Sequence, residues 1–214
     1  MPRPTPTRVY HFTRIEHLPT VVESGLLCDR QAQQDGLLAI EVGNTGIKAR
    51  RATRPVPVRP GGVVADYVPF YFGPRSPMMS SIHHGNVPGY TQGTDRLIYL
   101  ATTVETLLEV GLDPVFTDRN AVLDYTGFIQ LRDGEPEDGF IDWPLMDERY
   151  WSDTDTYPDR RERRMAECLV LSAVPWDAFL FVGAKSQTVV DEVQELIGSG
   201  SSAPRVAARP DWYF

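Results

Sequence analysis

The chain has 214 residues, 42% of them hydrophobic and 23% charged, which is ordinary for one globular domain, and we expect a single domain over residues 1–214. No apolar run approaches the roughly 18–20 residues of a membrane span, and the first residues lack the apolar core of a signal peptide. We therefore expect a cytoplasmic protein without membrane contact. Two cysteines cannot form a disulfide framework or, by themselves, a zinc site.

The net charge of −8 argues against a generally basic surface for nucleic acid. The charge is unevenly distributed: residues 1–60 carry nine Lys and Arg against five Asp and Glu, whereas residues 105–160 carry four against fifteen. An acidic chain binds nucleic acid where its basic residues line one groove. The arginines available for such a groove are Arg50, Arg51, Arg54, Arg59, Arg75, Arg119, Arg163 and Arg164. Scattered, solvated arginines are the alternative.

The first predicted strand covers residues 9–13, where aromatic and β-branched residues alternate. Tyr10 and Phe12 share one face, and His11 and Thr13 share the other. A histidine among strand-forming residues is more often a core residue than a catalyst. The helical spacing of apolar residues over 15–22 predicts a short helix, which Gly25 would end.

Residues 29–62 lack a clean period, apart from a possible short helix at residues 45–51. A loop of this length is often functional. It carries the pair Arg50-Arg51, and the planar guanidinium of arginine suits a pyrophosphate, although paired arginines in loops are usually solvated.

Residues 63–72 form the strongest strand candidate in the first half, and Pro69 predicts an edge position or a bulge there. Residues 80–95 are expected to form a loop. The adjacent His83 and His84 would point in opposite directions on an extended chain and have no acidic or cysteine partner nearby, so no metal site is expected.

The rest of the chain alternates short strands with few helices. Residues 132–160 are acidic and poor in apolar periodicity, which is typical of a surface loop, although Trp143 and Trp151 suggest that part of it packs. Strands are predicted at residues 97–101, 114–117, 178–182 and 205–208, and helices at 104–110 and 187–197. Without regular βα alternation the fold class is α+β. Neither a Rossmann nor a P-loop glycine pattern is present.

Glu167 lies where the charged run of residues 161–164 meets the apolar run of residues 168–171. A carboxylate at the mouth of a buried strand is costly to desolvate unless it has a partner or a function. The simplest interpretation is a solvated residue at the strand start, paired with Arg163 or Arg164. The alternative is a catalytic carboxylate.

Four blocks in order resemble the DarT family, whose members are toxins that ADP-ribosylate bases of single-stranded DNA. The blocks are Tyr10-His-Phe-Thr13, Arg50-Arg51, residues 68–78 and Ala166-Glu-Cys-Leu-Val170. The resemblance extends from about Val9 to the end of the sequence, and it implies an ADP-ribosyltransferase-like split β-sheet core with peripheral helices and long functional loops. It also implies NAD as a substrate, no metal, and a cognate DarG-like macrodomain antitoxin as partner.

The resemblance further implies roles for individual residues. Glu167 would be the catalytic carboxylate, and Arg51 would act with it or hold the NAD phosphates. The other NAD-binding residues would be His11, Thr13, Tyr71 and Phe72. Contacts to DNA would come from Arg75, Met78, Arg119, Trp151, Arg163 and Arg164.

The chemistry of the reaction agrees with a carboxylate at position 167. Breaking the bond between nicotinamide and ribose builds positive charge, which an anionic carboxylate stabilises. A thymine N–H must lose its proton to attack, and a carboxylate can accept that proton. The resemblance leaves the base open between thymine and guanine, with thymine favoured. An NAD-dependent transferase acting on RNA or protein, and a non-catalytic module that binds nucleic acid, remain as alternatives.

Overall fold

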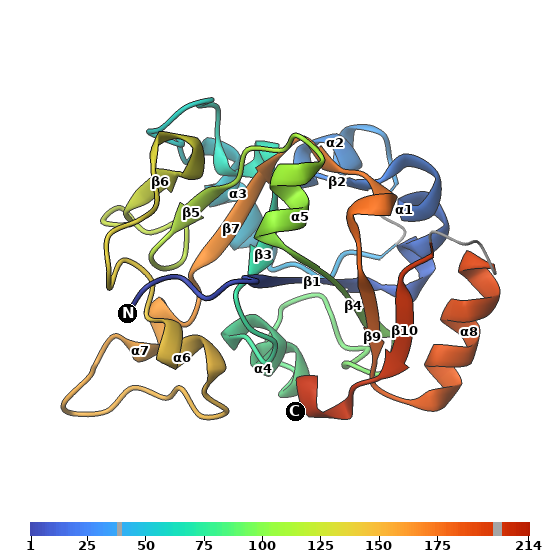
Figure 1. The fold of residues 1–214 in the computed structure, drawn as a ribbon. Helices are drawn as coiled ribbons and strands as arrows, with labels where there is room; N and C mark the ends of the chain where they lie inside the picture. Colours follow the sequence, from blue (N-terminus) through green and yellow to red (C-terminus); the bar gives the residue numbers. More distant parts are fainter. Residues whose placement is uncertain (38–39, 199–202) are drawn as a thin grey trace.

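The structure, a computed structural model, describes residues 1–37, 40–198 and 203–214. Its centre is an eight-stranded sheet in the order β10-β9-β4-β1-β3-β7-β5-β6 (Figure 1). The strands of this sheet are β1 (Arg8–Arg14), β3 (Tyr67–Tyr71), β4 (Leu97–Thr103), β5 (Val115–Thr117), β6 (Phe128–Gln130), β7 (Glu167–Leu171), β9 (Phe181–Ala184) and β10 (Arg205–Ala208). A separate pair joins β2 (Leu26–Leu27) to β8 (Ala173–Val174). Mixed helices and sheet confirm the predicted class.

The helices are short and lie around the sheet. They are α1 (Leu18–Ser24), α2 (Asp29–Gln34), α3 (Thr45–Thr53), α4 (Pro77–His83), α5 (Val104–Glu109), α6 (Trp143–Asp147), α7 (Arg160–Arg163) and α8 (Gln187–Ile197). Within the described ranges, no helix has both the length and the apolar composition needed to cross a membrane.

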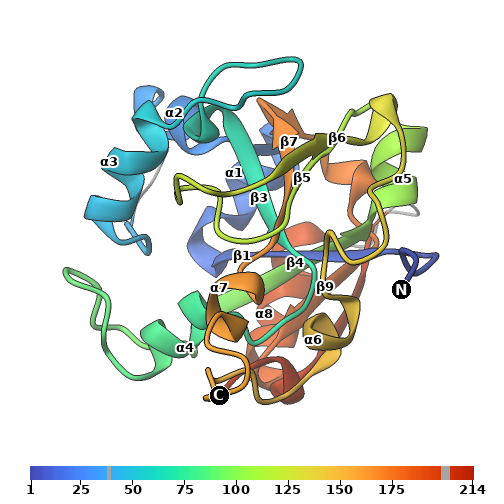
Figure 2. The same ribbon diagram turned by 90° about the vertical axis from the view of Figure 1, so that its left-hand side faces the viewer.

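The sheet is divided between β1 and β3. Strand β1 pairs with β4 over its whole length, from Arg8 to Arg14, but with β3 only at Tyr10 and Tyr71. In Figure 2, β3 runs steeply across the direction of β1. Two half-sheets, β10-β9-β4-β1 and β3-β7-β5-β6, therefore meet at a single register pair, and the expected split sheet is confirmed.

Pro69 lies next to this division. The sequence predicts an edge strand or a bulge at Pro69, but β3 is an interior strand, because it pairs with β7 on its other side. The Pro69 carbonyl accepts a hydrogen bond from the His11 side chain of β1. The Pro69 carbonyl thus faces the split between β1 and β3. Proline has no backbone N–H, and it is tolerated here because the two strands are not paired at this position.

The core is continuous on one face of the sheet and divided on the other. On the continuous face, residues of both half-sheets, including Val68, Leu100 and Val170, share one buried cluster with α1, α5 and α8. On the divided face, Tyr10 and Tyr99 pack with α4 and the C-terminal residues, whereas Tyr67 and Leu169 belong to another cluster. This arrangement leaves space between the half-sheets on one side only.

Several boundaries differ from the sequence predictions. The strand predicted at residues 63–72 begins at Tyr67, after a 3-10 turn at Val64–Asp66, and the one predicted at 178–182 begins at Phe181. Residues 77–83 of the expected turn and loop are helical, since Ser76 caps the helix by accepting from the Met79 N–H. The acidic segment contains α6, which buries Trp143. Short helices of this kind lack enough turns to show a period.

Candidate active site

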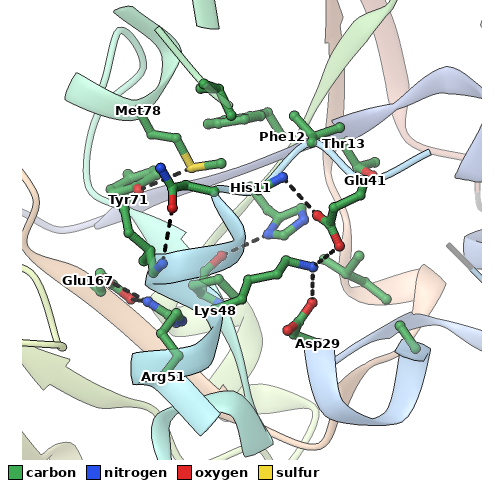
Figure 3. A pocket seen from close by; sticks show the side chains of 18 of the residues that line it. His11, Phe12, Thr13, Asp29, Glu41, Lys48, Arg51, Tyr71, Met78 and Glu167 are labelled. Atoms are coloured by element: carbon green, nitrogen blue, oxygen red, sulfur yellow. Dashed lines mark hydrogen bonds and ion pairs between the residues drawn. The ribbon is translucent and has the colours of Figure 1, made fainter. Parts of the chain in front are cut away.

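A cavity of about 390 Å³ lies at the split of the sheet. Side chains from β1, β3 and β7 form part of its wall, and residues of β2, α1–α4, α7 and the loops between them contribute the rest. Figure 3 shows Glu167 and Arg51 on one side of His11, and Thr13 and Glu41 on the other. The cavity is therefore long enough to bring residues from both half-sheets to one ligand.

Glu167 and Arg51 form a buried ion pair in this cavity. Arg51 Nη1 donates to both carboxylate oxygens, at 2.9 and 3.1 Å, and only 2% of the Glu167 side chain is exposed. Arg51 lies in the last turn of α3, a helix that Asn44 starts by accepting from the Gly46 and Ile47 N–H groups. Glu167 does not pair with Arg163 or Arg164, so the interpretation as a solvated, locally paired residue is wrong.

The pair leaves hydrogen-bonding capacity unused. Arg51 Nη2 is buried without a partner among the described residues. On the other side, the Ala121 N–H donates to Glu167 Oε1 at 3.4 Å, which is a long hydrogen bond. A buried donor of this kind is matched by an anionic or hydroxyl oxygen of a ligand. The donor set therefore suits a phosphorylated sugar such as NAD.

His11 occupies the split itself. Its Nδ1 lies 2.8 Å from the Pro69 carbonyl oxygen. Because a carbonyl only accepts, Nδ1 carries the proton, and Nε2 of the neutral ring is left as an acceptor. Burial lowers the pKa of His11 to about 4, with a smaller contribution from the nearby positive charge of Arg51 and partial opposition from the bond to Pro69. The ring is thus neutral at physiological pH and able to accept from a ribose hydroxyl.

His11 should make stability depend on pH. Its pKa is about 4 in the folded protein and 6.5 in an exposed chain, so the unfolded state binds more protons between these values. Stability supplied by neutral His11 is therefore lost as the pH falls from 6.5 toward 4, by at most about 1.4 kcal/mol per pH unit. We therefore expect the free energy of unfolding, measured with urea, to fall by about 1–2 kcal/mol less for His11→Asn than for the wild type when the pH is lowered from 7.5 to 5. Parallel pH dependence of the two proteins would contradict this, and the exposed His84→Asn serves as control.

Of the remaining predicted NAD-binding residues, Thr13 and Tyr71 line the cavity and Phe72 does not. Tyr71 lies parallel to Phe12, and its hydroxyl lies 3.9 Å from Met78 Sδ. Successive residues of a strand point to opposite faces, and Phe72 is buried against Phe116 and Trp143 on the continuous face. Phe72 therefore lies outside the cavity lining, and the sequence does not show which aromatic residue of the run faces the split.

Arg75 and Trp151 form a cluster with the C-terminal residues. The Arg75 guanidinium lies 3.9 Å from the centre of the Phe214 ring and donates to the Tyr213 carbonyl. Trp151 Nε1 donates to the Arg75 carbonyl at 2.8 Å, and its ring packs on the edge of Phe214. Met78, in the first turn of the neighbouring helix α4, lines the cavity. The structure thus brings Arg75, Trp151 and Met78 to one side of the site.

The other predicted DNA-binding arginines are largely paired. Arg119 contacts Asp118 and Glu162, and Arg163 contacts Asp142 and Asp159. Neither arginine therefore has a free charge to offer without breaking an ion pair.

Arg164 is buried, with 1% of its surface exposed, and donates to the Pro74 carbonyl. Gly73 permits this contact, since a Cβ there would lie 2.9 Å from both terminal nitrogens of Arg164. Burial lowers the pKa of Arg164 to about 10, above physiological pH. Arg164 thus holds the β3–α4 turn from inside the protein, a placement that the sequence does not reveal, and its contact with DNA stays a prediction.

Three further residues that line the cavity were not identified from the sequence. His17 lines it next to Thr13, and Lys48 lines it while pairing with both Asp29 and Glu41. Arg161 lines it beside Met165 and has no ion-pair partner among the described residues. The free arginine of the run at 160–164 is thus Arg161, which no periodicity in the sequence distinguishes from its neighbours. No group of three His, Cys, Asp or Glu suited to a metal ion occurs among the residues described.

The comparisons with known proteins place the chain, with its split sheet and its buried glutamate–arginine pair, in the class of ADP-ribosyltransferases. Within that class the chain belongs to the DarT family, whose model, described as ssDNA thymidine ADP-ribosyltransferase, matches residues 10–214. A DNA ADP-ribosyl transferase of Thermus sp. (strain 2.9) is 36% identical over 99% of this chain and 98% of its own length. One of Mycobacterium tuberculosis (strain ATCC 25618 / H37Rv) is 29% identical over 99% and 91%, respectively.

Solved structures agree with this assignment. Thermus sp. 2.9 DarT in complex with ADP-ribosylated ssDNA superposes with a TM-score of 0.85, at 34% identity and full coverage of both chains. The same protein in complex with NAD+ gives a TM-score of 0.82, at 33% identity and 99% coverage of each chain. Thermosipho africanus DarTG in complex with ADP-ribose is 19% identical with a TM-score of 0.79, covers 97% of this chain and 51% of the other, and supports the fold alone.

Proposed function

We propose that this protein transfers ADP-ribose from NAD to a thymine base of single-stranded DNA and releases nicotinamide, with residues 1–214 acting as one transferase domain. The observation that carries the proposal is the buried Glu167–Arg51 pair in a cavity at the split of the sheet. Membership of the DarT family and the titles of the Thermus structures, which name NAD+ and ADP-ribosylated ssDNA, support it.

The Glu167 carboxylate has two tasks in this reaction. When bound, NAD supplies an ADP-ribosyl group joined to a positively charged leaving group. Glu167 accepts a hydrogen bond from the ribose and, as an anion in a water-poor site, stabilises the positive charge that develops as nicotinamide leaves with the bonding electrons. It then takes the N–H proton of thymine as the ring nitrogen bonds to the ribose carbon. Arg51 fixes the orientation of the carboxylate through Nη1 and offers Nη2 to the substrate.

The other residues bind the two substrates on either side of this pair. His11, Thr13 and Tyr71 would hold NAD from within the cavity. Met78, Arg75 and Trp151 would meet the DNA on the α4 side, with Arg119 near the cavity wall at Asn120. Arg163 is tied to two carboxylates and would support the α7 region rather than contact DNA directly.

The cellular role follows from the chemistry of the modification. A base that carries ADP-ribose at a ring nitrogen cannot pair normally, so the activity would block replication and make the protein toxic to its host. We propose that it acts in the cytoplasm and is countered by a DarG-like macrodomain antitoxin. Membership of the DarT family is the ground for proposing such a partner.

The function is tested by incubating the purified protein with NAD and four single-stranded oligonucleotides that each contain one type of base in a variable position. We expect mass spectrometry to show a gain equal to one ADP-ribose on the thymine-containing oligonucleotide only. Modification of guanine instead would change the base assignment. Label on RNA or protein alone would favour the alternative acceptor, and no NAD consumption with any acceptor would favour a non-catalytic binding module.

A further inference from the structure

We propose that His17, through Nε2, binds the adenosine end of NAD and is a further specificity-determining residue of the site. This inference rests on the proposed function, since it requires NAD to occupy the cavity. His17 lies in the 3-10 turn Ile15–His17 that links β1 to α1, and its side chain lines the cavity.

The two nitrogens of the His17 ring have different surroundings. Nδ1 lies 3.0 Å from Thr13 Oγ1, a contact that fixes the ring against β1. Nε2 is buried and has no hydrogen-bond partner among the described residues, although the residue is 7% exposed. Burying a hydrogen-bonding nitrogen without a partner is unfavourable, and such atoms in folded proteins call for an explanation. The contact of Nδ1 with Thr13 explains how the ring is held in place, but it does not explain the buried Nε2, which is available to a ligand.

The ring is suited to a neutral ligand group. Burial lowers the pKa of His17 below its ordinary value, so the imidazole is neutral at physiological pH. A neutral imidazole has one donor and one acceptor nitrogen, and the Thr13 hydroxyl can rotate to match either tautomer. Nε2 can therefore donate to a purine nitrogen or accept from a purine amino group or a ribose hydroxyl.

The location of His17 in the cavity indicates that the adenosine end of NAD, rather than the nicotinamide end, would lie next to it. The nicotinamide ribose must lie at Glu167, where its bond is broken. In Figure 3, Thr13 lies on the opposite side of His11 from Glu167, and residues His11 and Thr13 are separated along the strand by about 6–7 Å. His17, bonded to Thr13, belongs to that far end of the cavity.

Residues near His17 add apolar surface to the lining of the cavity. Thr20 and Val21 follow His17 by three and four residues, lie on the same side of the turn that begins α1, and line the cavity. Leu27 and Ile40 add apolar surface to the lining. A flat purine ring is bound by apolar walls and a few directed hydrogen bonds, and Nε2 is a free polar group of this kind.

Two substitutions of His17 distinguish the role of Nδ1 from the role of Nε2. In His17→Asn, the amide nitrogen replaces Nδ1 and keeps the contact with Thr13, but nothing replaces Nε2. In His17→Gln, the longer side chain brings an amide near the position of Nε2. Titration calorimetry would measure the binding of NAD, ADP-ribose and nicotinamide mononucleotide to both variants, to the wild type and to the exposed control His84→Asn.

We expect His17→Asn to bind NAD and ADP-ribose about 5- to 10-fold more weakly, the effect of one lost hydrogen bond, with unchanged affinity for nicotinamide mononucleotide. His17→Gln should recover most of the loss, and His84→Asn should match the wild type. The ratio of the affinities for ADP-ribose and the mononucleotide within one variant does not depend on the fraction of folded protein, so it remains informative if a variant is less stable.

Two results would overturn the inference in distinguishable ways. If the wild type binds neither NAD nor ADP-ribose, the proposed function fails and the role of His17 fails with it. If the wild type binds both, but His17→Asn binds them equally well or weakens the mononucleotide to the same extent, only the role of His17 is wrong.

Discussion

Glu167→Gln is expected to lower ADP-ribosyl transfer to DNA by at least about 10³-fold, since the change removes both the charge that stabilises the transition state and the proton acceptor. The substitution preserves the size of the side chain in a site where Glu167 is 1% exposed. The fold should therefore remain intact, and binding of NAD should weaken far less than turnover. Single-turnover assays with labelled NAD and a thymine-containing oligonucleotide would measure the effect.

Glu162→Gln is the matched control for this experiment. Glu162 lies in α7, close in sequence to Glu167, but its carboxylate is bonded to the exposed Tyr125 hydroxyl and lies outside the cavity lining. Its substitution should leave transfer within a few-fold of the wild type. Retention of a tenth or more of the activity by Glu167→Gln would show that another group performs the chemistry.

Arg51→Met should destabilise the protein by about 2 kcal/mol or more, because it leaves the buried Glu167 carboxylate without its ionic partner. The double variant Arg51→Met, Glu167→Gln should be more stable than Arg51→Met alone, since a neutral amide is less costly to bury than an unpaired charge. Urea unfolding of the four proteins gives the interaction free energy of the pair, which we expect to be about 1–3 kcal/mol.

The neighbouring arginine provides a control for the loss of a positive charge. Arg50 precedes Arg51 in α3, is exposed, and does not line the cavity. Arg50→Met should change stability by less than about 0.5 kcal/mol, as is usual for exposed positions. An interaction free energy near zero for Arg51 and Glu167 would mean that the two side chains are held in place independently.

The sequence predicts most strands of the half-sheets because each has its own pattern of alternation or apolar run, but it does not predict the three-residue strand β6. The strands at Val9–Thr13 and Leu97–Ala101 and the helix at Thr45–Arg51 are confirmed with small changes at their ends. Glu167 is recognised as unusual because a carboxylate next to four buried positions conflicts with its surroundings. The pairing of Glu167 with Arg51 joins residues far apart in the chain, and no local pattern determines it.

The sequence does not predict the orientation of a side chain where tertiary contacts decide it. Phe72 and Tyr71 are adjacent aromatic residues, and only the split of the sheet determines that Tyr71 faces the cavity. Arg164 has the composition of a surface residue, yet Gly73 leaves room for its guanidinium inside the protein. His17 has no motif around it, and its importance depends on one nitrogen that finds no partner among the described residues.

The single register pair between β1 and β3 also affects how the molecule can move. A change in the angle between the half-sheets would break the pairing of Tyr10 with Tyr71 and the hydrogen bond from His11 to the Pro69 carbonyl, while the ladders within each half would persist. The continuous apolar cluster on the opposite face would act as the axis of this motion. Opening of the sheet at this division would therefore leave the strand pairing of both half-sheets intact.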